Sequence, residues 1–469
     1  MSIVFCGIVP HPPIMVPEVG REESDKVEAT QDALLELGRR ISASGAETLV
    51  IISPHGPVFG DAIGLNVEER AAGDLARFGA PQVYMDEPAD LELAAEIKSR
   101  GKDFRLLIVE INDRLARNFR GRVSTEMDHG VVAPMYWIKR SGWRGRFLAV
   151  SMGLLPHHQL YSFGIAVRRA AEALGRKVAL VASGDLSHRL TVDAPAGFSP
   201  RGKVFDAEIV RIFRENDLQA IFELSDDLCE EAGECGLRPI IMMLGALDGY
   251  QVHSEVLSYE GPFGVGYMVA SLAPGKKDDQ RAILANLLKV REEKVKARRA
   301  NESYLVRIAR QRLENWVRGI DKLPDLGEVP PEFRRRAGVF VSIKKDGALR
   351  GCIGTVKPTT PSIVEEVMEN AVSAGIRDPR FYPVRADELD ELEYSVDVLS
   401  EPEKVNSLDD LDPKRYGVIV RARGRSGLLL PDLEGIDTPE EQVRIAKEKA
   451  GLGPDDEVAL ERFTVTRYK

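Results

Sequence analysis

The stretch that decides the fold of the first half reads Ile3-Val4-Phe5-Cys6-Gly7-Ile8-Val9-Pro10-His11-Pro12-Pro13. Its apolar run predicts a strand buried on both faces, and a histidine between prolines follows. The stretch Leu49-Val50-Ile51-Ile52-Ser53-Pro54-His55-Gly56-Pro57 repeats this arrangement. Ligands of open α/β sheets bind beyond the carboxyl ends of the strands. We therefore expect His11 and His55 to lie at that edge of one sheet, on backbone that the prolines stiffen.

Each of these places, where polar residues directly follow the end of a buried strand, is called a corner. A third corner lies further along the first half. Val178-Ala179-Leu180-Val181 predicts another buried strand, and Ser183-Gly184-Asp185-Leu186-Ser187-His188 comes directly behind it. All seven histidines lie within the first 253 residues, and the second half has one cysteine. Three polar corners behind three strands indicate a metal-centred active site, and this site must belong to the first half.

The first 275 residues alternate strand-like and helical patterns. Strands are predicted near residues 2–9, 47–53, 104–110, 147–152, 177–183, 252–259 and 264–272, and helices near 22–43, 158–174, 204–215 and 237–249. This alternation predicts an α/β domain with a mixed central sheet flanked by helices, over residues 1–275. The polar, turn-rich stretch 273–279 marks the expected boundary.

The second half predicts an α+β domain over residues 283–469. A charged helical pattern runs from about residue 280 to 317. Strands are then expected at 338–344, 393–399 and 416–420, with helices near 361–374 and 438–450. The mixed charges of residues 289–299 favour a solvated helix over a basic contact surface.

Composition excludes several classes of protein. The 469 residues carry a net charge of −10, and four scattered cysteines fit a reducing cytosol, so we expect a cytoplasmic protein. No signal peptide and no membrane-spanning run are predicted. Residues 1–275 hold 28 Lys and Arg against 38 Asp and Glu, and residues 276–469 hold 36 of each. Neither half has the basic excess of a nucleic-acid-binding protein.

The two histidine corners predict metal ligands. Two histidines and one carboxylate on one face are typical of non-haem Fe(II) enzymes, although zinc or another divalent metal fits imidazole as well. The third ligand is either Glu234 or Cys235, which open an apolar helix where an anion is favoured. Glu260 is a less favoured alternative. Glu234 would suit iron and oxygen chemistry, whereas Cys235 would make a softer site.

Acid and base catalysis is predicted from the third corner. Imidazole titrates near pH ~6.5, so His188 is the candidate general base. Asp185, three residues earlier, would orient His188 or contact the substrate. His129, in a turn-like Met127-Asp128-His129-Gly130 string, would bring another imidazole to the pocket.

Together these strings resemble a known superfamily. Pro10-His11-Pro12-Pro13, Ser53-Pro54-His55-Gly56, Asp128-His129-Gly130 and the stretch 183–188 resemble the class III, LigB-type extradiol ring-cleavage dioxygenases. They resemble equally the Memo family, which shares that fold. The resemblance, over roughly residues 1–272, implies Fe(II) held by His11, His55 and a late glutamate. It also implies an acid–base role for His188 and a pocket position for His129.

The third-ligand region matches both families in part. Memo proteins carry a cysteine there, in a Cys-Gly-x-x-Pro-Ile string, and Cys235-Gly236-Leu237-Arg238-Pro239-Ile240 matches it, directly behind Glu234. The second half resembles the AMMECR family through Leu349-Arg350-Gly351-Cys352-Ile353-Gly354-Thr355. AMMECR and Memo-like proteins occur with a radical-SAM protein in the AmmeMemoRadiSam system, so this chain resembles two members fused.

Three functions follow as hypotheses. The first is an Fe(II)-dependent dioxygenase that cleaves a catechol-like aromatic substrate with O₂. The second is a Memo-like metal-binding accessory to a radical-SAM partner, without ring cleavage. The third is a zinc hydrolase in the same pocket. Extradiol-type folds often pair symmetrically, so a homodimer is expected.

The glycine-flanked Cys352 allows two interpretations. An arginine beside a thiol, here Arg350, favours the reactive thiolate. We expect instead a buried cysteine on a glycine-bent strand, with Arg350 in a structural ion pair, because this half has no histidine to serve as a base.

Overall fold

The computed structural model describes residues 2–119, 123–345, 348–386, 388–433 and 435–469. The chain divides after Val290 into two compact units, Met1–Val290 and Arg291–Lys469. Within the described part of the chain, no helix combines the length and the apolar character that crossing a membrane requires.

The first unit is built on one eight-stranded sheet. Its strands lie in the order β6-β3-β7-β2-β8-β1-β10-β9. Their bounds are β1 Ile3–Val9, β2 Thr48–Ser53, β3 Ile63–Asn66, β6 Ile108–Ile111, β7 Arg146–Ser151, β8 Val178–Ser183, β9 Tyr250–Glu260 and β10 Tyr267–Lys277. The pairs β7–β2, β2–β8 and β8–β1 are parallel, whereas β1–β10 and β3–β7 are antiparallel. The predicted mixed sheet is therefore confirmed.

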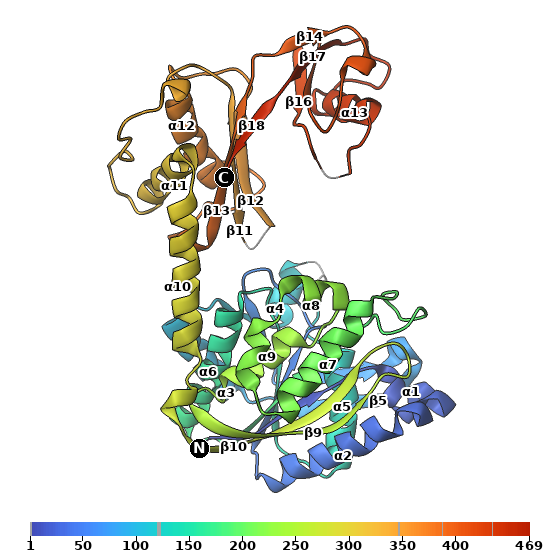
Figure 1. Ribbon diagram of the computed structural model, residues 1–469. Coiled ribbons are helices and arrows are strands. Elements are labelled where there is room, and N and C mark those ends of the chain that lie inside the picture. Colours follow the sequence, from blue (N-terminus) through green and yellow to red (C-terminus); the bar gives the residue numbers. More distant parts are fainter. Residues whose placement is uncertain (1, 120–122, 346–347, 387, 434) are drawn as a thin grey trace. The chain divides into compact units, whose positions relative to one another are not determined.

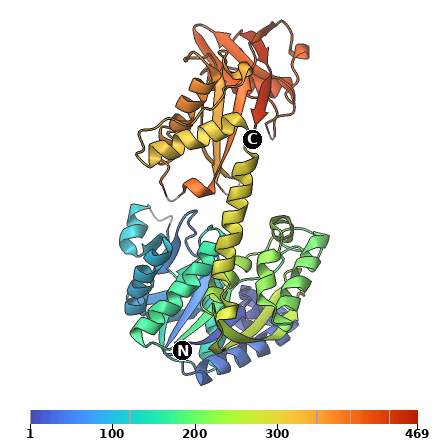
Figure 2. The ribbon, with the colours of Figure 1, turned by 60° about the vertical axis from the view of Figure 1, so that its left-hand side comes forward.

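Helices cover both faces of this sheet, as Figures 1 and 2 show. On one face lie α2 (Glu28–Ala43) and α5 (His129–Arg140), which pack on each other. On the other lie α3 (Leu91–Gly101), α6 (His157–Leu174) and α9 (Leu237–Gly245). Two separate apolar cores result, one on each face. Strands β2 and β8 are buried at every residue because both faces are covered.

The remaining elements of the first unit lie around these layers. They are α1 Pro17–Gly20, α4 Asp113–Asn118, α7 Pro200–Arg214, α8 Asp226–Ala232, β4 Arg70–Leu75 and β5 Ala80–Pro88. β4 and β5 form a separate two-stranded hairpin. The sequence patterns did not predict this hairpin or β3, since these segments are short or charged. β10 also continues through the polar stretch predicted as a turn, with Pro274 still paired to Val252.

The second unit contains two antiparallel four-stranded sheets, which confirms the predicted α+β class. One has the order β12-β11-β13-β18 and the other β14-β17-β15-β16. Their bounds are β11 Val339–Lys345, β12 Ala348–Thr355, β13 Leu392–Leu399, β14 Glu403–Val405, β15 Gly417–Ala422, β16 Arg425–Leu429, β17 Ala459–Phe463 and β18 Val465–Tyr468.

Each sheet of the second unit has its own helices and core. The helices α11 (Tyr304–Val317) and α12 (Ile363–Ile376) cover one face of the β12-β11-β13-β18 sheet. The helix α13 (Pro439–Lys449) packs on β15 and β16 of the other sheet (Figure 1). The charged helix α10 (Leu284–Asn301) has no buried residue over its length, in line with the predicted solvated helix.

Candidate metal centre

The three predicted corners meet at one edge of the first sheet. β1, β8 and β2 are parallel neighbours, so their carboxyl ends coincide. His11, Asp185 and His55 each follow the last residue of their strand by two positions. Identical spacing behind neighbouring strands places three polar side chains side by side, as the two histidine corners indicated.

Hydrogen bonds fix the orientation and the tautomer of His11. The ring is buried, and its Nδ1 lies 3.0 Å from the hydroxyl of Ser183. That hydroxyl donates its own hydrogen to the carbonyl of Gly130, at 2.5 Å. Ser183 can therefore only accept from His11, so Nδ1 carries the proton and Nε2 keeps its lone pair. An imidazole in this tautomer is ready to bind a metal through Nε2.

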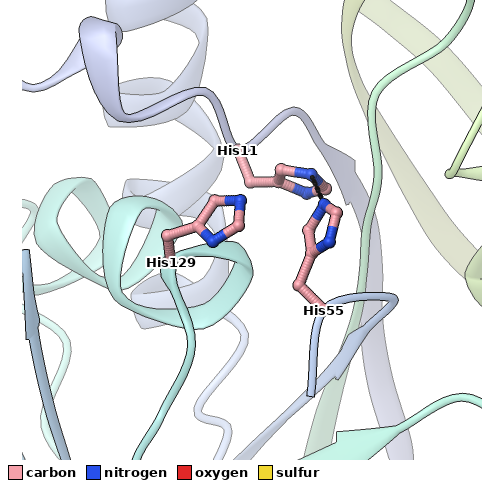
Figure 3. Close-up of side chains that lie close together, drawn as sticks. All are labelled: His11, His55 and His129. Atoms are coloured by element: carbon pink, nitrogen blue, oxygen red, sulfur yellow. Dashed lines mark hydrogen bonds between the residues drawn. The ribbon is translucent and has the colours of Figure 1, made fainter. Parts of the chain in front are cut away.

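His55 and His129 complete a cluster of three imidazoles (Figure 3). The Nε2 atoms of His11 and His55 lie 2.9 Å apart. Two nitrogens bound to one metal ion would stand about 3 Å apart. His129 is the first residue of helix α5, and Asp128 caps this helix by accepting a hydrogen bond from the N–H of Gly130. The ring of His129 stacks on the ring of His55, with 4.4 Å between the ring centroids. Ligand atoms of all three histidines lie within 4.8 Å of one another.

The two candidates for the third ligand make different contacts in the structure. The carboxylate of Glu234 accepts from Leu237 N at 2.6 Å, at the start of α9. The thiol of Cys235 lies 3.7 Å from His11 Nε2. Among the described residues, His11, Asp185 and Cys235 form a second group with ligand atoms within 4.8 Å. Cys235 thus faces the imidazoles, while Glu234 serves as a helix cap.

Two glycines bring Cys235 to the site. The loop after β8 crosses the loop before α9 so closely that a Cβ on Gly184 would meet Gly236 Cα at 2.1 Å. The backbone N–H of Asp185 then donates to the Cys235 sulfur at 3.3 Å. The N–H of Gly236 donates in return to the Asp185 carbonyl at 3.0 Å. The crossing requires hydrogen as the side chain of residue 184, and at residue 236 a Cβ would stand only 3.0 Å from the Asp185 carbonyl oxygen.

Glu260 lies elsewhere. Its carboxylate accepts from the N–H of Thr30 at 2.8 Å and from its hydroxyl at 2.5 Å. These bonds tie the end of β9 to helix α2, which is a structural role. Both hydrogen bonds that Glu260 accepts here thus come from Thr30 of α2.

Burial sets the protonation of the cluster. Burial and the neighbouring imidazoles hold the pKa of His11 well below its usual value, and that of His55 falls to about 4. Burial raises the pKa of Asp185 to about 7, and burial with the nearby Asp185 raises that of the Cys235 thiol. Neutral imidazoles, a thiol that burial keeps protonated and a carboxyl that is half-protonated near pH 7 form a donor set that a cation would stabilise.

His188 lies beside this donor set, positioned for proton transfer. Its Nδ1–H donates to the carbonyl of Gly233 at 2.7 Å, which leaves Nε2 free. Nε2 lies 3.8 Å from the carboxylate of Asp185. Burial lowers the pKa of His188, so the ring is neutral and can accept a proton near pH 7.

Two supporting residues were missed by the sequence reasoning. Ser183 fixes His11, as described above. Asp206 of α7 is fully buried and accepts from Ser187 N and from the Tyr259 hydroxyl, each at 2.8 Å, which holds the loop of Asp185 and His188. Ser183 could have been noticed as the polar end of a buried strand, whereas Asp206 lies in an ordinary helical pattern without any local signal.

Comparison with protein families identifies both halves. Residues 6–270 match the family described as the catalytic LigB subunit of aromatic ring-opening dioxygenase. Residues 306–469 match the AMMECR1 family. The catalytic and ligand candidates of the first unit all lie inside the first match.

One relative matches this chain over its whole length, and the other similar proteins match part of it. Protein CA_C1420 of Clostridium acetobutylicum is 39% identical over 473 residues, which span the whole of both chains. A Thermotoga maritima protein is 55% identical over 160 residues, 34% of this chain and 92% of its own. Among solved structures, Pyrococcus horikoshii PH0010 is 34% identical, with a TM-score of 0.33, over 35% of this chain and 88% of its own. Escherichia coli JW3007 is 14% identical, with a TM-score of 0.40, over 58% and 99%.

Proposed function

This chain belongs to the LigB family, and an AMMECR1 domain follows the LigB domain in the sequence. On that premise we propose that the first unit holds a Memo-like transition-metal centre. His11, His55 and Cys235 would hold the metal, with Asp185 and His129 beside them. The observation that carries the proposal is the place of the thiol, 3.7 Å from His11 Nε2, while Glu234 caps α9.

The donor set suits a soft or borderline cation. Imidazole and thiolate together select iron, copper or zinc over magnesium or calcium. When bound, such a metal supplies Lewis acidity and, for iron or copper, electron transfer. The chain's own residues supply the rest. Ser183 orients His11, the backbone of Asp185 orients Cys235, and His188 Nε2 accepts a proton from a ligand that enters beside Asp185.

Metal content tests the ligand assignment. The full chain, purified without oxygen, would be compared with Cys235→Ser, Glu234→Gln and His11→Gln variants by elemental analysis. We expect near-stoichiometric metal in the wild type and in Glu234→Gln, and at least a tenfold loss of affinity in the other two. Because Glu234→Gln can still cap α9 through its amide oxygen, it is the matched control. Loss of metal in Glu234→Gln with retention in Cys235→Ser would overturn the proposal.

A second candidate function is ring cleavage of a catechol-like substrate with O₂ and Fe(II). The pair of His188 and Asp185 favours it, because a neutral base stands beside the metal ligands. His188 would remove a hydroxyl proton as the substrate binds. His188→Gln should then lower turnover by about 10² to 10⁴ while the metal stays bound. A wild type that holds iron but leaves every catechol unchanged would remove this candidate.

The Memo-like assignment also carries a proposal about partners. A chain that unites LigB-type and AMMECR1 domains would act with a radical-SAM protein, as in the system that the sequence resembles. Co-purification from the native host, with and without the Cys235→Ser substitution, would test this. The absence of any iron–sulfur protein in the wild-type sample would count against the partnership.

A further inference from the structure

Tyr267, the first residue of β10, lies directly beside the loop of the third corner. The residue before it, Gly266, is bonded twice to that loop. Its N–H donates to the Ser187 carbonyl, and its carbonyl accepts from the N–H of Leu186, each at 2.9 Å. The backbone of β10 is thus fixed against the loop that carries Asp185, on the strand side of the metal centre.

Tyr267 also lies next to His11, on the same face of the sheet. In the antiparallel register of β1 and β10, Ile8 lies opposite Ala270. Three further steps along this register bring His11 opposite Tyr267. Tyr267 belongs to the apolar core that helix α5 covers, and His11 faces α5 as well, because its ring lies 5.5 Å from that of His129. The two side chains are therefore cross-strand neighbours.

The hydroxyl of Tyr267 differs from those of other tyrosines of the first unit in its lack of a partner. The residue is 2% exposed, and none of the described residues forms a hydrogen bond with its hydroxyl. Tyr136, Tyr161 and Tyr259, by contrast, each donate to a carboxylate, at 2.7, 2.9 and 2.8 Å. Because a buried phenol usually has a partner, the unpaired one beside the donor set indicates a group that a bound ligand completes.

Asp185 and His188 are spaced for a ligand hydroxyl between them. Asp185 Oδ2 lies 3.8 Å from His188 Nε2, which is too long for a direct hydrogen bond. This distance allows one oxygen atom to bond to both groups. The other carboxyl oxygen, Oδ1, already accepts from the backbone N–H of His11 at 2.9 Å, so the carboxyl group is held in place. A hydroxyl that enters here can pass its proton to His188 Nε2.

The acidic groups near Tyr267 determine which oxygen its hydroxyl can bind. Glu260 lies opposite Tyr267 in the pairing of β9 with β10, and Asp185 lies within electrostatic reach. Burial and these two carboxyl groups raise the pKa of the Tyr267 phenol, so the hydroxyl keeps its proton and can donate it in a hydrogen bond. A ligand carboxylate near two acidic side chains would be repelled, whereas a carbonyl oxygen is neutral and accepts.

We propose, on the basis of the metal centre assigned above, that Tyr267 is a ligand-binding residue of that centre and that its ligand carries a hydroxyl and a carbonyl oxygen on neighbouring atoms. The proton of the ligand hydroxyl passes to His188 Nε2. The Tyr267 hydroxyl donates a hydrogen bond to the carbonyl oxygen. Tyr267 thereby distinguishes a ligand that has this carbonyl from one that only binds the metal.

Two small ligands test this role on the metal-loaded full chain. Acetohydroxamate is neutral and carries a hydroxyl and a carbonyl oxygen on neighbouring atoms. Azide binds metals through nitrogen and has no oxygen, so it serves as the reference. Calorimetric titration would give both affinities. We expect Tyr267→Phe to weaken acetohydroxamate binding about five- to tenfold and to change azide binding by less than about twofold, because only the hydroxamate loses a hydrogen bond.

Tyr161→Phe is the matched control, since it removes a buried phenol hydroxyl that donates to Asp248. It should lower the melting temperature by about 2–4 °C and leave both affinities unchanged. Tyr267→Phe should keep the melting temperature and the metal content of the wild type. A Tyr267→Phe protein that holds metal and azide and binds acetohydroxamate as before, or that loses both ligands equally, would overturn this role and leave the metal centre in place. A wild type without metal would overturn both.

Discussion

The two units each present an accessible thiol, and the neighbours of the two thiols differ in kind. Cys235 lies beside neutral imidazoles and the carboxyl of Asp185, whose pKa burial raises to about 7. The Cys352 sulfur accepts a hydrogen bond from the Ser342 hydroxyl, and the Cys352 backbone is bonded to Asp378 and Arg380, which form an ion pair with each other. Imidazole nitrogens and a sulfur that face one place accept a cation, whereas an ion pair already supplies its own counter-charge. The thiol of the first unit is therefore set up for metal binding, whereas the charged neighbours of the thiol in the second unit are satisfied by each other.

The largest effect on the first site is expected from a substitution that forces apart the loop after β8 and the loop before α9. In Gly184→Ala, the new methyl group would overlap Cα of Gly236. The atoms that it would meet belong to the backbone of Gly236, so no side chain can move aside to make room. We expect a loss of about 3 kcal/mol in the free energy of unfolding and the loss of bound metal. Denaturant unfolding and elemental analysis measure the two effects.

Two other glycines serve as controls for this prediction. Gly60→Ala meets open space and should change the free energy of unfolding by less than about 0.5 kcal/mol. Gly351→Ala would press on the Ala374 carbonyl, so it should disturb Cys352 and leave the metal content unchanged. A Gly184→Ala protein with normal stability and full metal would contradict the crossing of the two loops.

A serine hydroxyl bonds to His11 in the first unit and another bonds to Cys352 in the second, so serine-to-alanine substitutions test both contacts. Ser183→Ala removes the acceptor that fixes the His11 tautomer, and we expect metal affinity to fall about 10- to 100-fold. Ser342→Ala removes a single neutral hydrogen bond to sulfur, so alkylation of Cys352 should slow only two- to threefold, about 0.5 kcal/mol. Metal titration and alkylation rates measure the two effects. Equal effects in both units would show that the first site does not depend on a fixed tautomer.

The sequence predicted the elements whose burial leaves a simple pattern. β1, β2 and β8 were found because strands covered on both faces are continuous apolar runs. The hairpin of β4 and β5 was missed, since Arg70–Leu75 and Ala80–Pro88 carry charges on a surface ribbon. β3 has only four residues, including a glycine, and so gives no periodic signal.

The site was predictable where it depends on strand ends and unpredictable where it depends on contacts between loops. His11 and His55 could be paired because equal spacing behind parallel strands brings them together. The choice between Glu234 and Cys235 depends on how residues 184 and 236 cross, which no local pattern encodes.

Acidification should separate the histidine-rich unit from the histidine-free one. Burial lowers the folded-state pKa of His11, His55, His129 and His188, so the unfolded chain binds more protons below pH ~6.5. Stability from these groups is complete above that pH and is lost as the pH falls toward about 4, the folded-state pKa of His55. Asp185, with a pKa of about 7, and Asp206, with a pKa of about 6, oppose this, because each takes up a proton in the folded chain over the same range.

We expect the metal-free first unit to lose on the order of 1–2 kcal/mol between pH 7 and 5, after allowance for the solvent that reaches the part of His55 not covered by its neighbours. The second unit should change little over this range. Amide exchange, corrected for the intrinsic effect of pH, measures each unit separately in the full chain. A parallel loss in both units would show that the histidines are not the cause.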